Sequence, residues 1–240
     1  MNFGEFLGGK AQQPLPASLA GDETSLSDFS ILCRKLCQKL LSLFALGLDV
    51  DSGPDFFTPH HPILPTEDAQ SGSILRLLYY PPLSTAYKKE IDIRAGAHSD
   101  YGSVTLLFQR PGQSGLQILT STGDWADVPA GKDGDILINI GDLLEYWTAG
   151  VLKSTVHRVI FPEGGQEERY SMAYFCHPVD KTALNPVPSD MVREHAKSTG
   201  LQQQAGEDGS KAMTAKQHLH KRLAETYGWG KEETSNPMAV

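Results

Sequence analysis

Two histidines and an aspartate near the middle of the chain have the residue types of a metal site. His98 and Asp100 are separated by one residue, and His157 lies well downstream. On a β-strand, side chains at positions i and i+2 point to the same face, so His98 and Asp100 can converge on one ion. Two histidines and one carboxylate are the ligand set of non-haem Fe(II) oxygenases. The alternatives are a polar strand end for the first pair and a packed core position for His157.

A second group of residues has the chemistry to hold an organic acid. Arg169 and Ser171 share one strand face by the same spacing. A guanidinium binds a carboxylate through two parallel hydrogen bonds, and a serine hydroxyl adds another. Such a pair would hold the far end of an anionic co-substrate whose other end chelates the metal; an exposed pair without function is the alternative. Tyr79 or Tyr80 would donate a further hydrogen bond, or serve as an aromatic core anchor before Pro81.

Strand-like segments position all of these residues. Regularly spaced short strands are typical of a β-sandwich or barrel. The connecting segments are too short for the crossover helices of a parallel sheet. The sequence therefore predicts a mainly β fold with flanking helices. The short apolar or alternating runs are residues 74–80, 91–97, 104–108, 115–119, 136–140, 155–161 and 170–175.

Helical and irregular segments flank this β region. Apolar residues recur at helical spacing from Phe29 to Leu48, which predicts a helix of about six turns that starts at Ser25 or Ser27 and ends at Gly47. Residues 212–227 predict a terminal helix. The segments expected to be irregular or mobile are 1–24, 52–73, 198–210 and 231–240.

Composition excludes several classes of partner. The 240 residues include 21 Lys+Arg and 29 Asp+Glu, so the formal net charge is −8. Non-specific binding to nucleic acid needs clustered positive charge instead. No apolar run reaches the roughly 20 residues that span a bilayer, and the N-terminus lacks the features of a secretory signal. We therefore expect no nucleic-acid partner, no membrane association and a cytoplasmic location.

The three cysteines, Cys33, Cys37 and Cys176, form an odd and sparse set. This excludes a disulfide framework and favours reduced thiols in a reducing compartment. Cys33 and Cys37 lie four residues apart on one face of the expected helix, where they have the spacing to begin a metal site. No second pair of Cys or His follows at a suitable spacing, so we interpret both as small buried hydrophobic side chains.

Several linked motifs follow one another along the chain: LRLLYYPP (75–82), AHSDYGSVTLLFQ (97–109), GLQIL (115–119), GDILINIGDLLEYWTAG (134–150), KSTVHRV (153–159) and RYSMAYFCHP (169–178). The chain resembles the isopenicillin N synthase-like group of Fe(II)/2-oxoglutarate-dependent dioxygenases over about Leu75 to Pro178. Two positions depart from the usual family pattern, with Leu78 before the two tyrosines and Leu83 after the prolines.

The resemblance implies a fold, a cofactor and a co-substrate. It implies a double-stranded β-helix (jelly-roll) core, Fe(II) as the metal, and 2-oxoglutarate and O₂ as co-substrates. The metal ligands would be His98, Asp100 and His157. The residues that bind 2-oxoglutarate would be Arg169, Ser171 and Tyr80. The activity would be the oxidation of a small organic molecule by hydroxylation, desaturation or cyclisation, with release of succinate and CO₂.

The same resemblance and the strand phase indicate a substrate pocket. If Arg169 and Ser171 point into the barrel, Phe175 and His177 do so too, because all four positions have the same parity. Phe175 matches a substrate-stacking position in the family, with a plain core residue as the alternative. We assign Phe175, Tyr101 and His177 to the pocket.

The sequence divides into three expected regions. Residues 1–73 form a partial helical and loop region that packs on the core, 74–180 form the jelly-roll domain, and 181–240 form a C-terminal extension with one helix and a flexible tail. Relatives begin with a longer N-terminal region than this chain shows. This difference leaves a catalytically weak metal-binding protein open as one alternative. A second alternative is an Fe(II) oxidase of the same fold that does not use 2-oxoglutarate, because such oxidases in the family share much of the motif set.

Overall fold

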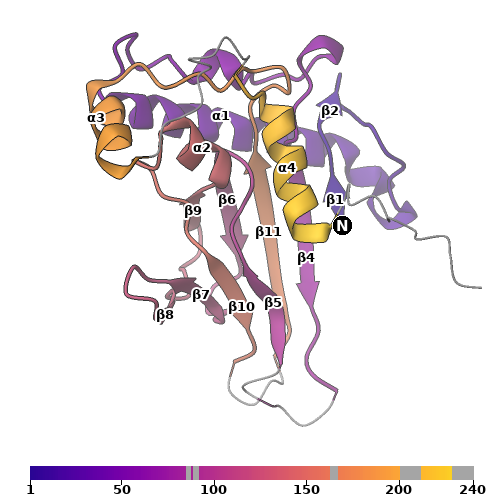
Figure 1. Ribbon diagram of the computed structural model, residues 1–240. Helices are drawn as coiled ribbons and strands as arrows, with labels where there is room; N and C mark the ends of the chain where they lie inside the picture. Colours follow the sequence, from indigo (N-terminus) through magenta and orange to yellow (C-terminus); the bar gives the residue numbers. More distant parts are fainter. Residues whose placement is uncertain (85–87, 89–91, 163–166, 201–211, 229–240) are drawn as a thin grey trace, which may run out of the picture.

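Two antiparallel sheets form the centre of the molecule (Figure 1). The computed structural model describes residues 1–84, 88, 92–162, 167–200 and 212–228. The larger sheet has the order β1-β4-β11-β6-β9, and the smaller has the order β5-β10-β7-β8. The strands are β1 (Asn2–Phe3), β4 (Ile74–Tyr80), β5 (Ile93–His98), β6 (Val104–Gln109), β7 (Leu116–Leu119), β8 (Trp125–Asp127), β9 (Ile136–Ile140), β10 (His157–Ile160) and β11 (Arg169–Cys176).

This arrangement confirms the mainly β fold with flanking helices. Each of the seven strands expected from the sequence has a counterpart. β4 and β9 have the expected bounds, and the ends of the other five differ by at most two residues where the structure describes them. The short β8 was not expected, because three residues carry too little alternation to be recognised. A cavity between the two sheets receives alternate side chains of β11, including Arg169, Ser171 and Phe175. The intervening side chains of that strand point to the other face of the larger sheet.

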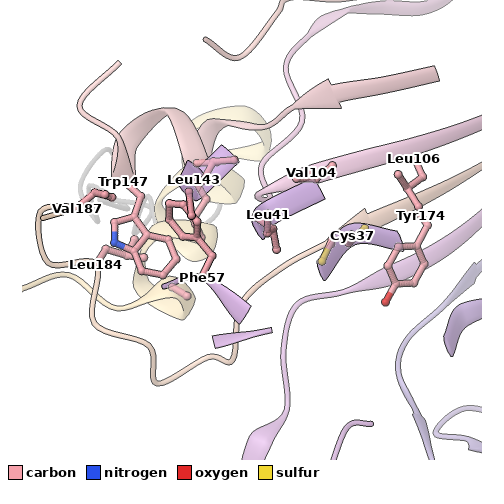
Figure 2. Packing of buried hydrophobic residues seen from close by; sticks show 14 of the residues in the cluster. Cys37, Leu41, Phe57, Val104, Leu106, Leu143, Trp147, Tyr174, Leu184 and Val187 are labelled. Carbon is pink, nitrogen blue, oxygen red and sulfur yellow. The ribbon is translucent and has the colours of Figure 1, made fainter. Parts of the chain in front are cut away.

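The long helix α1 (Glu23–Gly47) covers that other face and crosses the strands (Figure 1). Its residues Cys33, Cys37 and Leu41 are at most 3% exposed and recur every four positions, as expected for one helix face. They pack with Leu106, Tyr174 and other residues of the sheet (Figure 2). The burial of Cys33 and Cys37 confirms their interpretation as core side chains, and Cys176 is buried as well.

The start of α1 differs from the sequence prediction. The helix begins at Glu23 after Asp22, and neither Ser25 nor Ser27 caps it. Ser27 is buried within the first turns, where its hydroxyl is on the face that packs inward. A capping residue is recognised in sequence only by its place before a periodic run, and the polar residues before Phe29 left that place ambiguous.

The N-terminal residues are more ordered than expected. β1 pairs with β4 at the edge of the larger sheet, and β2 (Phe6–Leu7) pairs with β3 (Lys10–Ala11) in a separate ribbon. Glu5, which lies between β1 and β2, forms a buried ion pair with Arg34 of α1, with 2.5 Å between Glu5 Oε1 and Arg34 Nη2. Arg34 Nη2 also donates to Ser73 Oγ, and its Nε donates to the Tyr174 hydroxyl. This network joins the N-terminal segment, α1 and β11.

Three shorter helices complete the described fold. α2 (Asp142–Trp147) and α3 (Asp190–Thr199) were not expected, although Ser189 caps α3 and Gly200 ends it in the left-handed conformation. The predicted terminal helix is present as α4 (Ala215–Tyr227), which begins with a capping box of Thr214 and Gln217. Residues 198 and 199 of the expected mobile loop end α3, whereas 201–210 and 231–240 lie outside the described residues. Among the described helices, none has both the length and the apolarity needed to cross a lipid bilayer.

Candidate metal centre

His98, Asp100 and His157 come together at one end of the cavity. His98 ends β5 and His157 begins β10, and the two residues face each other in the antiparallel register of these strands. Their imidazole ring centroids are 4.4 Å apart. Asp100 follows β5 by two residues, and its Oδ1 lies 3.8 Å from Nε2 of His157. One ligand atom from each side chain lies within 4.8 Å of the others, which is close enough to share an ion.

Hydrogen bonds set the orientation of both imidazole rings. Nδ1 of His98 lies 2.7 Å from the carbonyl oxygen of Gly96, and Nδ1 of His157 lies 3.0 Å from that of Thr155. A carbonyl oxygen only accepts, so Nδ1 is the protonated nitrogen in each ring. In the neutral imidazole this leaves a lone pair on Nε2, the form that coordinates metals. Both rings are therefore prepared as ligands by their own backbone.

The cavity beside these ligands has a volume of about 450 Å³. Small-molecule sites have volumes of this order and mix apolar walls with a few polar groups. Five other residues assigned to the site from the sequence line it: Tyr80, Tyr101, Arg169, Ser171 and Phe175. The metal ligands and the expected co-substrate residues thus belong to one continuous space between the sheets.

Residues 71–178 match the family model of the 2OG-Fe(II) oxygenase superfamily. The UPF0676 protein of Schizosaccharomyces pombe is 37% identical over 82% of this chain and 54% of its own length. A protein of Penicillium crustosum named 2-oxoglutarate-dependent dioxygenase traH is 35% identical over 76% of this chain and 52% of its own length. The chain belongs to the 2OG-Fe(II) oxygenase superfamily. It spans about half the length of these two curated relatives.

The fold comparison agrees with this membership. A crystal structure of a full-length Neurospora crassa protein in complex with alpha-KG and thymine has a TM-score of 0.67 with 30% identity. The match covers 95% of this chain and 64% of that protein. The two antiparallel sheets of this 2OG-Fe(II) oxygenase superfamily member are therefore those of a jelly roll, as the sequence resemblance implied.

The donor set fits the Fe(II) of the superfamily because Asp100 is held with one oxygen directed to the histidines. Thr105 Oγ1 and Asn139 Nδ2 each donate to Asp100 Oδ2 at 2.7 Å. Thr105 on β6 and Asn139 on β9 are register partners. With Oδ2 occupied, Oδ1 is the oxygen left for a metal, so the site would offer an ion two nitrogens and one oxygen.

Sequence analysis did not identify Thr105 and Asn139. The one signal in the sequence is the alternation of side chains along 136–140, which places Leu137 and Asn139 on the same face, the one that lines the cavity. An amide on the inner face of an otherwise apolar strand needs a polar partner. That partner is identifiable only once the sheet register is known.

Arg169 is suited to hold an anion. It is 1% exposed. Its Nη1 donates to Ser171 Oγ at 3.1 Å and its Nη2 donates to Gln109 Oε1, whereas the buried Nε has no hydrogen-bond partner in the described part of the chain. The guanidinium carbon lies 5.5 Å from the ring centroid of Tyr80, and burial raises the pKa of that tyrosine, so its hydroxyl stays protonated and able to donate.

The assignment of His177 to the pocket differs from its place in the structure. β11 ends at Cys176, so the strand alternation no longer applies at the next residue. His177 is 4% exposed and packs closely against Gly102. A side chain at Gly102 would not fit, because its Cβ would lie 2.9 Å from Nε2 of His177. His177 therefore packs against the loop that follows Asp100, and it is not among the described residues that line the cavity.

Helix α4 forms a wall of the cavity next to the metal ligands. Thr226 and Tyr227 line it, and the Tyr101 hydroxyl donates to Thr226 Oγ1 at 2.8 Å. Arg222 of the same helix pairs with Asp142 at 2.8 Å, and Asp142 accepts from Ser99 Oγ, between His98 and Asp100. The C-terminal helix is thus connected to the metal-ligand loop by side-chain hydrogen bonds.

Proposed function

We propose that the protein is a non-haem Fe(II)- and 2-oxoglutarate-dependent oxygenase that oxidises a small organic molecule. The observation that carries this proposal is that one cavity is lined both by the candidate metal ligands His98, Asp100 and His157 and by the buried Arg169. An Fe(II) ion bound there would supply the redox chemistry in which O₂ converts 2-oxoglutarate to succinate and CO₂ as the substrate is hydroxylated, desaturated or cyclised.

The residues of the chain have separable parts in this function. The two imidazoles and Oδ1 of Asp100 would hold the metal. Arg169, Ser171 and Tyr80 bind the distal carboxylate of 2-oxoglutarate through charge-assisted and neutral hydrogen bonds. The apolar walls exclude water from the reacting groups and leave Phe175 and Tyr101 to contact the substrate.

The buried arginine favours 2-oxoglutarate over the alternative of an oxidase that does without it. A buried guanidinium with an unpartnered Nε is costly unless an anion joins it. A dicarboxylate bound to the metal at one end and to Arg169 at the other satisfies that requirement. The same residue also argues against a protein that only binds metal.

Anaerobic titration tests the ligand set and the co-substrate site together. Fe(II) and then 2-oxoglutarate are added to the protein, and the visible charge-transfer band of the ternary complex is expected to rise to saturation. O₂ is then admitted, and succinate is measured. Iron binding without the band would support the oxidase alternative. A band without succinate release, on the other hand, would support the catalytically weak metal-binding protein.

Location and partners are extensions of this proposal. A cytoplasmic location is supported by three cysteines that are all free and buried. A small-molecule substrate, with neither nucleic acid nor membrane as a partner, is supported by the net charge of −8. The division at residues 73 and 180 is supported by the position of β4 to β11 between these limits.

A further inference from the structure

A second arginine lies at the Arg169 end of the cavity. Arg94 of β5 lines the same space from the opposite sheet. Its guanidinium carbon is 4.6 Å from the ring centroid of Phe161, and its Nη2 donates to the backbone carbonyl of Glu167. Its Nε is buried and has no hydrogen-bond partner in the described part of the chain. Sequence analysis gave this residue no role.

The cavity lining supplies little negative charge around these two arginines, because Glu167, whose carboxylate favours the charged form of Arg94, is not among the described residues that line the cavity. Burial lowers the pKa of Arg94, and burial followed by the positive charge of Arg94 lowers the pKa of Arg169. Among the described residues that line the cavity, Asp100 is the one acidic side chain, and its oxygens are occupied by Thr105, Asn139 and the metal position. Two like charges in a partly desolvated space favour the binding of an anion between them.

We infer that Arg94 is a second co-substrate-binding residue, which shares the distal carboxylate of 2-oxoglutarate with Arg169. This inference rests on the proposed function. Two guanidiniums from facing sheets, with Tyr80 beside them, form a site for a whole carboxylate rather than for one of its oxygens. The second charge therefore raises the selectivity of the cavity for 2-oxo acids that carry a distal carboxylate.

Two ligands separate this role from a general effect on the cavity. 2-Oxoglutarate has the distal carboxylate, and 2-oxopentanoate has the same five carbons without it. Both are titrated anaerobically into the Fe(II)-loaded protein, with the charge-transfer band and calorimetry on the Mn(II)-loaded protein as readouts. We expect Arg94→Gln to weaken 2-oxoglutarate binding roughly 10- to 100-fold, as for loss of a charged hydrogen bond. The Kd of 2-oxopentanoate is expected to stay unchanged.

Arg158→Gln is the matched control. Arg158 lies on β10, next to the strand of Arg94, but stacks on Trp125 and bonds to Gln117 outside the cavity. Its replacement should leave both Kd values at the wild-type level. If Arg94→Gln does not fold, Arg94→Lys replaces it, because lysine keeps the charge and loses the planar guanidinium. Arg94→Lys should weaken the binding of 2-oxoglutarate and leave that of 2-oxopentanoate unchanged.

Specific outcomes would overturn the inference. One is an unchanged Kd for 2-oxoglutarate in the Arg94 variants, and another is equal weakening of both ligands, which would indicate a structural role. Wild-type protein that binds Fe(II) but neither 2-oxo acid would contradict the proposed function itself, and the inference would fall with it. Weaker 2-oxoglutarate binding in the Arg94 variants, with normal metal binding and no such defect in Arg158→Gln, supports both the inference and the proposed function.

Discussion

Asn139 donates a 2.7 Å hydrogen bond to Oδ2 of Asp100, the oxygen that is turned away from His157. The bond leaves Oδ1 as the oxygen nearest to the imidazole. Thr105, the register partner of Asn139, makes the same contact from the neighbouring strand. Two adjacent strands therefore fix the rotation of a carboxylate whose backbone belongs to neither of them.

The first prediction concerns this pair. Asn139→Leu and Thr105→Val each remove one donor and let the carboxylate rotate or bind in a bidentate manner, so each should weaken Fe(II) or Co(II) binding by about 10-fold or more. Metal titration followed by Co(II) absorption measures the effect without turnover. The control is Thr122→Val, because Thr122 lies in an exposed turn, bonds to Thr120 and Asp124, and does not line the cavity. Wild-type affinity in both inner variants would show that they do not position Asp100.

The second prediction separates metal binding from co-substrate binding. Asp100→Ala or His157→Ala should abolish stoichiometric Fe(II) binding, because two remaining ligands do not hold the ion at micromolar concentration. Arg169→Ala should keep metal binding and raise the Kd of 2-oxoglutarate roughly 100-fold. Anaerobic titrations of each component measure both quantities. Loss of metal binding in Arg169→Ala would mean that the arginine maintains the fold rather than the co-substrate site.

The third prediction concerns the buried ion pair between Glu5 and Arg34. Glu5→Gln leaves the Arg34 guanidinium, 2% exposed, without its counter-charge. Breaking a buried pair in this way costs about 3 kcal/mol of unfolding free energy. Lys10→Gln breaks the pair between the exposed Lys10 and Glu23 and should leave the free energy of unfolding nearly unchanged. Urea unfolding compares the two variants, and equal losses would contradict the assigned burial.

The fourth prediction is a loss of stability in acid that depends on His61. Burial lowers the pKa of His61 to about 3, while its ring bonds to the Phe57 carbonyl and the Ser103 hydroxyl. The unfolded chain takes up this proton near pH 6.5, so acidification favours unfolding. Above that pH, His61 does not lower the free energy of unfolding. Below it, the free energy of unfolding decreases by about 1.4 kcal/mol per pH unit as the pH falls towards 3.

Replacement of the histidine tests this dependence. His61→Gln should unfold with a smaller pH slope between pH 4 and 6, although His177, whose pKa burial lowers to about 4, keeps part of the slope. His220→Gln, on the exposed side of α4, should keep the wild-type slope. Chemical unfolding at several pH values supplies the data. A wild-type slope in the His61 variant would disprove its role.

Local spacing was sufficient to predict much of this protein. The i, i+2 spacing of Arg169 and Ser171 on β11 places both side chains in the cavity, as predicted. His98 and Asp100 also converge, although β5 ends at His98 and Asp100 lies in the loop that follows. Each expected strand exists, since alternation of apolar residues follows directly from which face is buried. The four-residue spacing of Cys33 and Cys37 likewise predicted a buried helix face.

Tertiary structure alone decided the contacts between distant segments. Strand register brings His157 opposite His98, and Asn139 beside Asp100, while a one-residue slip would turn each side chain to the other face. The pairing of Glu5 with Arg34 and the approach of Arg94 to Arg169 join segments whose local sequences carry no sign of each other. His177 shows the limit of spacing arguments, because its parity was correct for the cavity but its strand ended one residue earlier. Periodicity reports which face of an element is buried, whereas the partner of that face is set by how the sheets and helices pack.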